Sequence, residues 1–192
     1  GHDQVLRIRK KRKVELETAG RKDLGFIQQL YEAAFPANER KPFALLKRRQ
    51  RQGLSEILII REGAEPLGFM ITAEYRDMVM LDYFAIRPDG RGRGTGKKAF
   101  ALLKESCEGE RLFLEIERPT PDAANLTERA RRKAFYLQSG MQPSGIAVRI
   151  FGTDMELMHA SEPVSFEEYC ALLKANVGPL YYRIIRPTRE EE

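Results

Sequence analysis

The feature that most constrains the fold of this chain is a glycine-rich loop between a strand-like run and a helical segment. Residues 78–86 are rich in Met, Val, Phe and Ile; Gly92, Gly94 and Gly96 follow, and residues 97–104 have a helical pattern. Successive backbone N–H groups of such a turn can point at one spot, where the helix N-terminus adds partial positive charge. Glycine lets an anion reach the backbone and permits positive φ. The loop therefore predicts a phosphate or pyrophosphate site.

The segments around this loop show strand and helix patterns in a defined order. Residues 14–17 alternate like a short strand, and apolar residues recur at helical spacing over 23–34 and 42–52. Further strand patterns cover residues 56–61, 67–74, 78–86, 111–117, 146–151 and 155–159, and further helical patterns cover 97–104, 127–139 and a segment that Ser165 opens as N-cap. Strands that first form a meander and then alternate with helices predict an α/β fold around a mixed sheet.

Length and composition set broader limits. The 192 residues suit one domain, and the net charge of 33 − 28 = +5 favours anionic ligands without singling out nucleic acid. No apolar run is long enough to cross a bilayer, Gly1 and His2 resemble a purification remnant, and the basic residues 7–13 precede no apolar signal-peptide core. We therefore expect a cytoplasmic protein. Cys107 and Cys170 form no Cys-x-x-Cys pair, so neither a disulfide framework nor a zinc site is expected.

Two common phosphate-binding patterns do not fit the loop. A P-loop requires Ser or Thr after its Gly-Lys pair, but Gly96 and Lys97 are followed by Lys98. A dinucleotide-binding fold requires Gly-x-Gly-x-x-Gly early in a βαβ unit, whereas these glycines are spaced by two and come after a meander. Nucleotide hydrolysis and dinucleotide binding are therefore disfavoured.

The loop resembles the acyl-CoA loop of the GNAT superfamily of N-acetyltransferases, (Gln/Arg)-x-x-Gly-x-(Gly/Ala) after the fourth strand. Arg91, Gly94 and Gly96 match in register, and residues 81–89 resemble the family's approach to the loop. The resemblance implies a GNAT-like, mostly antiparallel sheet with helices on both faces, and acetyl-CoA as acyl donor without a metal. A plain strand-to-helix turn is the alternative. The residues expected to bind the cofactor are Phe84, Ala85, Ile86, Arg91, Gly92, Arg93, Gly94, Thr95, Gly96, Lys97 and Arg132.

Residues 135–141 resemble the second signature of the family, Phe/Leu-Tyr-x-x-x-Gly-Phe. By this resemblance Tyr136 is the candidate general acid that protonates the leaving thiolate; the alternative is a core tyrosine. The family often has Asn and Ala where this chain has Arg129 and Arg132. One of these arginines or Lys133 is expected near the CoA phosphates, unless together they form only a solvated basic face.

Amine transfer also requires a proton acceptor, because the attacking amine must be neutral. Glu74, Asp82, Glu115 and Glu117 are the candidate carboxylates on the expected central strands, and we favour Asp82. The competing interpretation is that these acids bind a cationic acceptor or pair with arginines. His159 is expected to be structural.

The resemblance covers about residues 16–157. It implies one GNAT-like acyltransferase domain over 1–192, with a core at about 14–159 and a helical extension at about 160–192, and an acceptor pocket formed by residues 35–41 and 160–185. The expected activity is acetyl transfer from acetyl-CoA to a primary amine, on a small molecule or a peptide, by direct attack in a ternary complex. No membrane partner is expected, and a homodimer is left open.

Two functions from other classes remain as alternatives. One is an acyl-CoA-binding or sensing module without turnover. The other is nucleic-acid binding through the basic residues 7–13 and the helix face at 47–51. Neither basic cluster has interleaved aromatic residues for base stacking, so the nucleic-acid reading is disfavoured.

Overall fold

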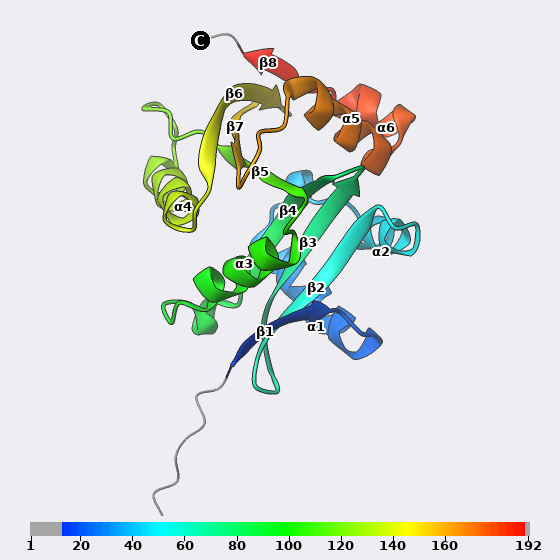
Figure 1. Ribbon diagram of the computed structural model, residues 1–192, viewed down its shortest axis with the longest axis vertical. Helices are drawn as coiled ribbons and strands as arrows, with labels where there is room; N and C mark the ends of the chain where they lie inside the picture. The colour runs from blue at the N-terminus through cyan, green and yellow to red at the C-terminus, as the bar shows by residue number, and fades with distance from the viewer. Residues whose placement is uncertain (1–12, 191–192) are drawn as a thin grey trace, which may run out of the picture.

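The computed structural model describes residues 13–190, and residues 1–12 and 191–192 lie outside the described part (Figure 1). The basic run at residues 7–13, which is disfavoured as a nucleic-acid contact, therefore lies outside it apart from Lys13. The strands are β1 (Val14–Thr18), β2 (Ser55–Glu62), β3 (Glu65–Tyr75), β4 (Met78–Ile86), β5 (Arg111–Glu117), β6 (Gln142–Ile150), β7 (Thr153–His159) and β8 (Thr188–Glu190). The helices are α1 (Arg21–Ala34), α2 (Phe43–Arg51), α3 (Thr95–Ser106), α4 (Leu126–Gln138), α5 (Phe166–Val177) and α6 (Pro179–Ile185), with short 3₁₀ turns η1 (Ala37–Glu39) and η2 (Pro88–Gly90).

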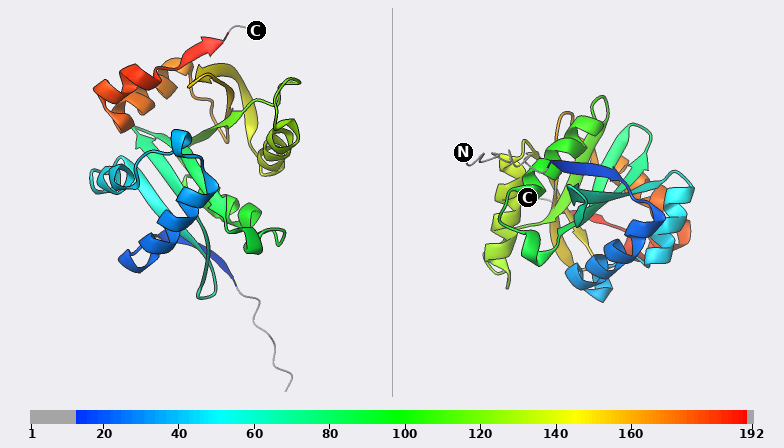
Figure 2. Two further views of the ribbon diagram at one scale, coloured as in Figure 1. Left: turned by 180° about the vertical axis from the view of Figure 1, so that it is seen from behind. Right: turned by 90° about the horizontal axis from the view of Figure 1, so that it is seen from below.

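The strands form one sheet in the order β1-β2-β3-β4-β5-β7-β6-β8. Among the described residues only β4 and β5 pair in parallel, because α3 carries the chain back between them, and the other six strand pairs are antiparallel. Helices α1 and α2 cover one face and α3 covers the other, as the front and back views show (Figure 2). The expected mixed, mostly antiparallel sheet with helices on both faces is confirmed.

Apolar side chains alternate along the central strands and so supply cores on both faces of the sheet. On β3, Met70 packs in the core beneath α3 and α4, whereas Phe69 and Ile71 pack in the core beneath α1 and α2. A third core joins α5 to the far half of the sheet, around Phe113 and Tyr169. A sheet buried on both faces explains why the central strands contain long apolar runs.

A β-bulge at Asp82 changes which face the residues of β4 occupy. Tyr83 pairs with Ile71 and Leu81 pairs with Thr72, so Asp82 is an extra residue on β4. Before the bulge Leu81 packs beneath α3, and after it Tyr83 packs beneath α1 and α2. The bulge therefore reverses the alternation of the strand just before it reaches the glycine loop.

The C-terminal tail contains more structure than the sequence patterns predicted. Ser165 does cap α5: the Glu168 N–H donates to Ser165 Oγ at 3.1 Å, and the Ser165 N–H donates to Glu168 Oε1 at 3.2 Å. Helix α6 and strand β8 were not predicted, and β8 adds an edge strand beside β6. Sequence patterns miss such short elements because α6, with seven residues, is shorter than the window in which a helical period is recognised, and β8, Thr-Arg-Glu, contains no apolar residue. The division into a core and an extension stays a prediction.

Gly68 is required where β3 passes β4 beside the loop, which allows a test of the β3–β4 packing. A Cβ on Gly68 would lie 2.3 Å from the Ala85 carbonyl oxygen and 3.1 Å from Ile86 Cα, both backbone atoms. We expect Gly68→Ala to lower the free energy of unfolding by roughly 2 kcal/mol or more, measured by urea denaturation.

Gly25→Ala is the matched control for this substitution. Gly25 lies in α1, and a Cβ there would meet nothing within 4 Å. The free energy of unfolding of this variant should rise by roughly 1 kcal/mol, because alanine forms helices better than glycine. Equal stabilities for the two alanine variants would show that the close β3–β4 approach is not a constraint.

Candidate active site

The glycine loop leads into the N-terminus of α3 with unpaired backbone donors. Helix α3 begins two residues before the predicted start, so Gly94 is its N-cap, with φ 74°, and Gly92 also has a positive φ of 85°. The first helical hydrogen bond runs from the Lys98 N–H to the Gly94 carbonyl, at 3.1 Å. The N–H groups of residues 95–97 precede it, so they are available to an anionic ligand.

Two arginines of the loop brace its backbone. Arg91 Nε donates to the Ile86 carbonyl at 3.3 Å, and Arg93 Nη2 donates to the Asp89 carbonyl at 3.1 Å. Both residues are exposed, and so is Lys97. The loop thus combines backbone donors with three cationic side chains, which suits a ligand with several phosphates.

Beside the loop, β4 and β5 diverge. They pair only from Met78 to Leu81 and from Arg111 to Leu114; beyond these residues β4 stays with β3, and β5 stays with β7. Within the described residues, the backbone of 82–86 on the side facing β5 therefore has no strand partner. Phe84, Ala85 and Ile86 border this gap, which is open to a chain-like ligand that could hydrogen-bond to an unpaired strand edge.

Tyr136 is held on α4 by two phenylalanines. Its ring lies 5.4 Å from that of Phe100 and 5.1 Å from that of Phe135, both nearly perpendicular to it. Only 8% of the residue is exposed. Burial raises the pKa of Tyr136 to about 12, and the charge of Arg132 partly opposes this shift. The phenol therefore keeps its proton throughout the neutral pH range.

The other basic residues of α4 pair with acids close to them. Arg129 Nε lies 2.8 Å from Glu117 Oε2, and Lys133 Nζ lies 2.8 Å from Glu156 Oε1. Arg132 is half exposed, with Nη2 3.5 Å from Glu128 Oε1. Arg129 and Lys133 thus form ion pairs with carboxylates, and Arg132 is the most exposed of the three and the most available to a ligand.

A cavity of about 200 Å³ lies where β4 and β5 separate. The segments that meet there are the η1 turn, β4, β5, the β6–β7 hairpin, α5 and α6. Its polar wall includes Glu39, Lys41, Asp82, Glu115 and Glu117. The cavity draws on both segments that the sequence pointed to for the acceptor, 35–41 and 160–185. Asp82, Glu115 and Glu117 are thus brought together, whereas Glu74 is not among the lining residues.

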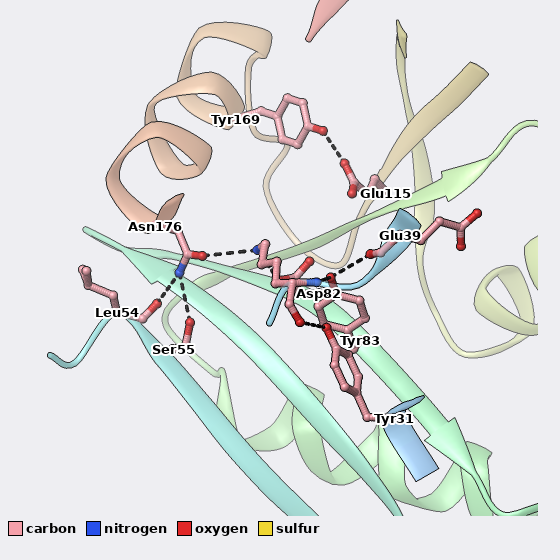
Figure 3. Close-up of polar contacts among 10 residues, drawn as sticks. Tyr31, Glu39, Leu54, Ser55, Asp82, Tyr83, Glu115, Tyr169 and Asn176 are labelled. Atoms are coloured by element: carbon pink, nitrogen blue, oxygen red, sulfur yellow. Dashed lines mark hydrogen bonds and ion pairs between the residues drawn. The ribbon is translucent and has the colours of Figure 1, made fainter. Parts of the chain in front are cut away.

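Lys41 connects Asp82 to Asn176 of helix α5. Figure 3 labels Asp82 and Asn176, between which the Lys41 side chain lies. Lys41 Nζ lies 2.6 Å from Asp82 Oδ2 and 3.3 Å from Asn176 Oδ1, and the two charged side chains are 13% and 9% exposed. Asn176 in turn donates to the Leu54 carbonyl and to Ser55 Oγ, each at 2.9 Å. An ion pair this buried orients Asp82 and ties β4 to two distant parts of the chain.

Two tyrosines fix the η1 segment above the cavity. The Tyr31 hydroxyl donates to the Lys41 carbonyl at 2.7 Å, and the Tyr83 hydroxyl donates to the Glu39 carbonyl at 3.0 Å. Tyr83 also accepts from the Lys41 N–H at 3.1 Å. Burial raises the pKa of both phenols, so both stay neutral donors.

Glu115, which lines the cavity, accepts a hydrogen bond from the hydroxyl of the buried Tyr169 (Figure 3). Burial raises the pKa of Glu115, while Tyr169 and the charge of Lys41 oppose that shift. A carboxyl with a raised pKa can exchange protons nearer neutral pH than an exposed one. Glu115 therefore joins Asp82 as a carboxylate that lines the cavity.

Sequence reasoning missed the residues that organise this cavity. Lys41 ended the expected acceptor segment, but no pattern connected it with Asp82. Asn176 and Tyr169 lie on the helix that Ser165 opens, and a polar residue on an apolar helix face is the only signal that pointed to them. Each acts through a partner more than 40 residues away in sequence, which one sequence cannot reveal.

No helix among residues 13–190 combines the length and the apolar character needed to cross a membrane.

Solved structures with the same fold come from several bacteria. A GNAT-family protein from Bacteroides thetaiotaomicron is 22% identical, with a TM-score of 0.66, over 82% of this chain and 93% of that one. The ribosomal-protein-S18-alanine N-acetyltransferase from Escherichia coli is 20% identical, with a TM-score of 0.53, over 80% and 98%. The YncA protein of Salmonella typhimurium, solved with its cofactor acetyl-CoA, is 17% identical, with a TM-score of 0.55, over 79% and 96%.

A search of curated proteins found no match. The family model described as Acetyltransferase (GNAT) family matches residues 24–131, which is more than half of the chain. The protein therefore belongs to the GNAT family of acetyltransferases.

Proposed function

We propose that this protein transfers an acetyl group from acetyl-CoA to a primary amine by direct attack in a ternary complex. The observation that carries the proposal is the continuity of the site. Unpaired N–H groups at residues 95–97 lie at one end of the gap between β4 and β5, and the same two strands border the cavity with its carboxylates. Family membership supports acyl transfer, and the Salmonella relative makes acetyl-CoA the donor to test first.

The proposed donor site fits the parts of coenzyme A in order along the gap. The N–H groups of residues 95–97 and the side chains of Arg91, Arg93 and Lys97 bind the pyrophosphate. The unpaired edge at Phe84, Ala85 and Ile86 hydrogen-bonds the amide-containing pantetheine arm. Arg132 is proposed to contribute charge from α4. Acetyl-CoA supplies an acyl group already activated as a thioester, and the Ala85 region supplies a backbone N–H to polarise its carbonyl.

Side chains of the protein then accept a proton from the amine and donate a proton to the leaving sulfur. Asp82 accepts a proton from the incoming ammonium, directly or through water, which leaves a neutral amine able to attack. Glu115 is the second candidate for this step. Tyr136 donates its phenolic proton to the departing sulfur, a role that its protonated state at neutral pH permits. The proton that the nitrogen loses as the tetrahedral intermediate collapses to the amide then returns to the phenolate, directly or through water. Positioning of amine and thioester across the β4–β5 gap supplies much of the remaining rate.

The cavity favours an acceptor of modest size with a cationic amine. Its volume of about 200 Å³ accommodates a single side chain or a small molecule. Its four acids outnumber its three cationic residues and so favour a positively charged acceptor; they are Glu39, Asp82, Glu115 and Glu117, against Arg40, Lys41 and Arg132. Phe151 and Tyr181 add apolar surface at its rim. A small-molecule amine or a peptide amine is therefore proposed, within a single acyltransferase domain that spans the chain.

The loop can be tested with two glycines that have similar backbones. Gly94 has φ 74°, Gly109 has φ 88°, and a Cβ at either would meet nothing within 4 Å. Because alanine disfavours positive φ, both alanine variants should lose some stability. Only Gly94→Ala should weaken CoA binding, by about tenfold as measured by calorimetry. The reason is that a distorted backbone at Gly94 would displace the N–H groups of residues 95–97, whereas a distorted backbone at Gly109 would not. Equal CoA affinity in both variants would remove the loop from the site.

Tyr136→Phe tests the proposed proton donor. Wild-type protein should release thiol from acetyl-CoA in the presence of one member of a panel of polyamines, aminoglycoside-type antibiotics, amino acids and peptides. Loss of the phenol should lower kcat roughly a hundredfold while the Kd for acetyl-CoA changes little.

Tyr75→Phe removes a hydroxyl at the end of β3, away from the gap, and is the matched control. It should keep wild-type kcat. Tight acetyl-CoA binding with no thiol release for any amine would instead favour the sensing module, and unchanged kcat in Tyr136→Phe would remove the tyrosine from the reaction.

Asp82→Asn and Glu115→Gln separate the two candidate proton acceptors. If Asp82 takes the proton, Asp82→Asn should reduce kcat/KM at neutral pH by about a hundredfold and recover part of it at high pH, where the free amine is already neutral. Glu115→Gln, whose amide oxygen can still accept a hydrogen bond from the Tyr169 hydroxyl, should lose much less kcat/KM. If Glu115→Gln instead shows the larger loss of kcat/KM and the recovery at high pH, the proton transfer would be assigned to Glu115.

A further inference from the structure

A second cavity lies on the α3 face of the sheet, away from the proposed active site. It has a volume of about 640 Å³ and lies between β1 and the last turn of α3, over the start of β2 and the end of β3. None of its lining residues lines the cavity between β4 and β5. We call it the acidic groove.

The charge of the acidic groove is unbalanced. One lysine and six glutamates line it: Lys13, and Glu15, Glu17, Glu56, Glu74, Glu105 and Glu110. Within residues 13–190 none of the six glutamates forms a salt bridge, although most other clustered acids of this chain do. Six carboxylates beside one lysine, in a protein of net positive charge, create a strong local attraction for cations.

Three of these carboxylates, Glu56, Glu74 and Glu110, line the groove near enough to influence one another electrostatically, and the buried Cys107 thiol lines it with them. Burial and then the charges of Glu56 and Glu110 raise the pKa of Glu74. Burial and the same acidic group also raise the pKa of the Cys107 thiol, although Ser106 opposes this. A cation bound beside Glu74 would relieve the repulsion from these neighbouring charges.

The floor of the groove contains a polar group without a partner. Thr72 is 1% exposed and lines the groove from β3, yet its Oγ1 has no hydrogen-bond partner within the described residues. Thr18, on the neighbouring wall, shows the usual outcome: its hydroxyl donates to Glu56 Oε1 at 3.0 Å. A buried hydroxyl left unsatisfied is rare in a native core and indicates a missing partner.

The arrangement of the acids decides the class of ligand. Among the described residues no group of three or more His, Cys, Asp and Glu side chains is placed to hold a metal ion. The carboxylates are instead spread along a groove far larger than one ion. We propose that the acidic groove binds a small organic polycation, a di- or triamine whose ammonium groups pair with Glu56, Glu74 and Glu110 and donate to Thr72 Oγ1.

Spermidine titrated into the full-length protein without acyl-CoA tests this proposal. Calorimetry should detect binding that weakens as salt is raised, because the contacts are ionic. The double variant Glu74→Gln/Glu110→Gln should weaken binding about tenfold or more. Glu162→Gln, which removes an exposed carboxylate outside the groove, should leave it unchanged.

Thr72→Val separates a ligand site from a purely structural role. Valine has nearly the same shape without the hydroxyl, so the variant should melt at a higher temperature than wild type, yet bind spermidine about threefold more weakly. No binding by wild type, or equal weakening in Glu162→Gln, would overturn the proposal. The proposal would also be overturned if Asp82→Asn lost spermidine binding while the groove variants kept it, because the amine would then occupy the acceptor cavity. All these results are independent of acyl transfer.

Discussion

The separation of β4 from β5 is the constraint on which the rest of this site depends. Two parallel strands that stayed paired would fill their edges with each other's backbone groups, and no ligand could enter the sheet. Here the pairing stops at Leu81 and Leu114. The extra residue at Asp82 bends β4 at that point and reverses the faces of the residues after it. One bulge thus opens the gap, places Asp82 in the cavity and directs the strand into the glycine loop.

The cavity is held in shape by polar contacts between segments that are distant in sequence. Lys41 lies between Asp82 and Asn176, and Asn176 is anchored to Leu54 and Ser55. Each of these groups is largely buried, and a buried charge without its partner is costly. The network therefore positions η1, β4 and α5 together, and motion of any one would disturb the others. This gives the acceptor side a rigid polar wall opposite a rim of aromatic residues.

The two ends of α3 have opposite electrostatic character. Its N-terminus presents unpaired N–H groups and the cationic loop, whereas its last turn borders a groove of carboxylates. The helix dipole favours anions at the first end and cations at the second. The two surfaces proposed to bind phosphates and amines thus lie at opposite ends of one helix, each at the end whose dipole suits the charge of its ligand.

The sequence by itself determined the parts whose signal is local. The periods of the strands and helices, the Ser165 capping box and the glycine loop all depend on residues within a few positions of each other, and the structure confirms them. The resemblance of residues 91–96 to one family likewise uses a short motif, and the family match over residues 24–131 bears out the family. The second motif, at residues 135–141, lies outside the matched residues. Local spacing is enough wherever one element supplies all the groups.

Only the tertiary structure decided the pairing of distant side chains. That Asp82 lies beside Lys41, that Arg129 faces Glu117, and that Tyr169 reaches Glu115 follow from how strands and helices pack. The short elements α6 and β8 also depend on packing, since too few of their residues repeat to show a period. The physical reason is the same in each case: burial and contact across the sheet are set by the register of β4 and the position of α5, which no nearby residues encode.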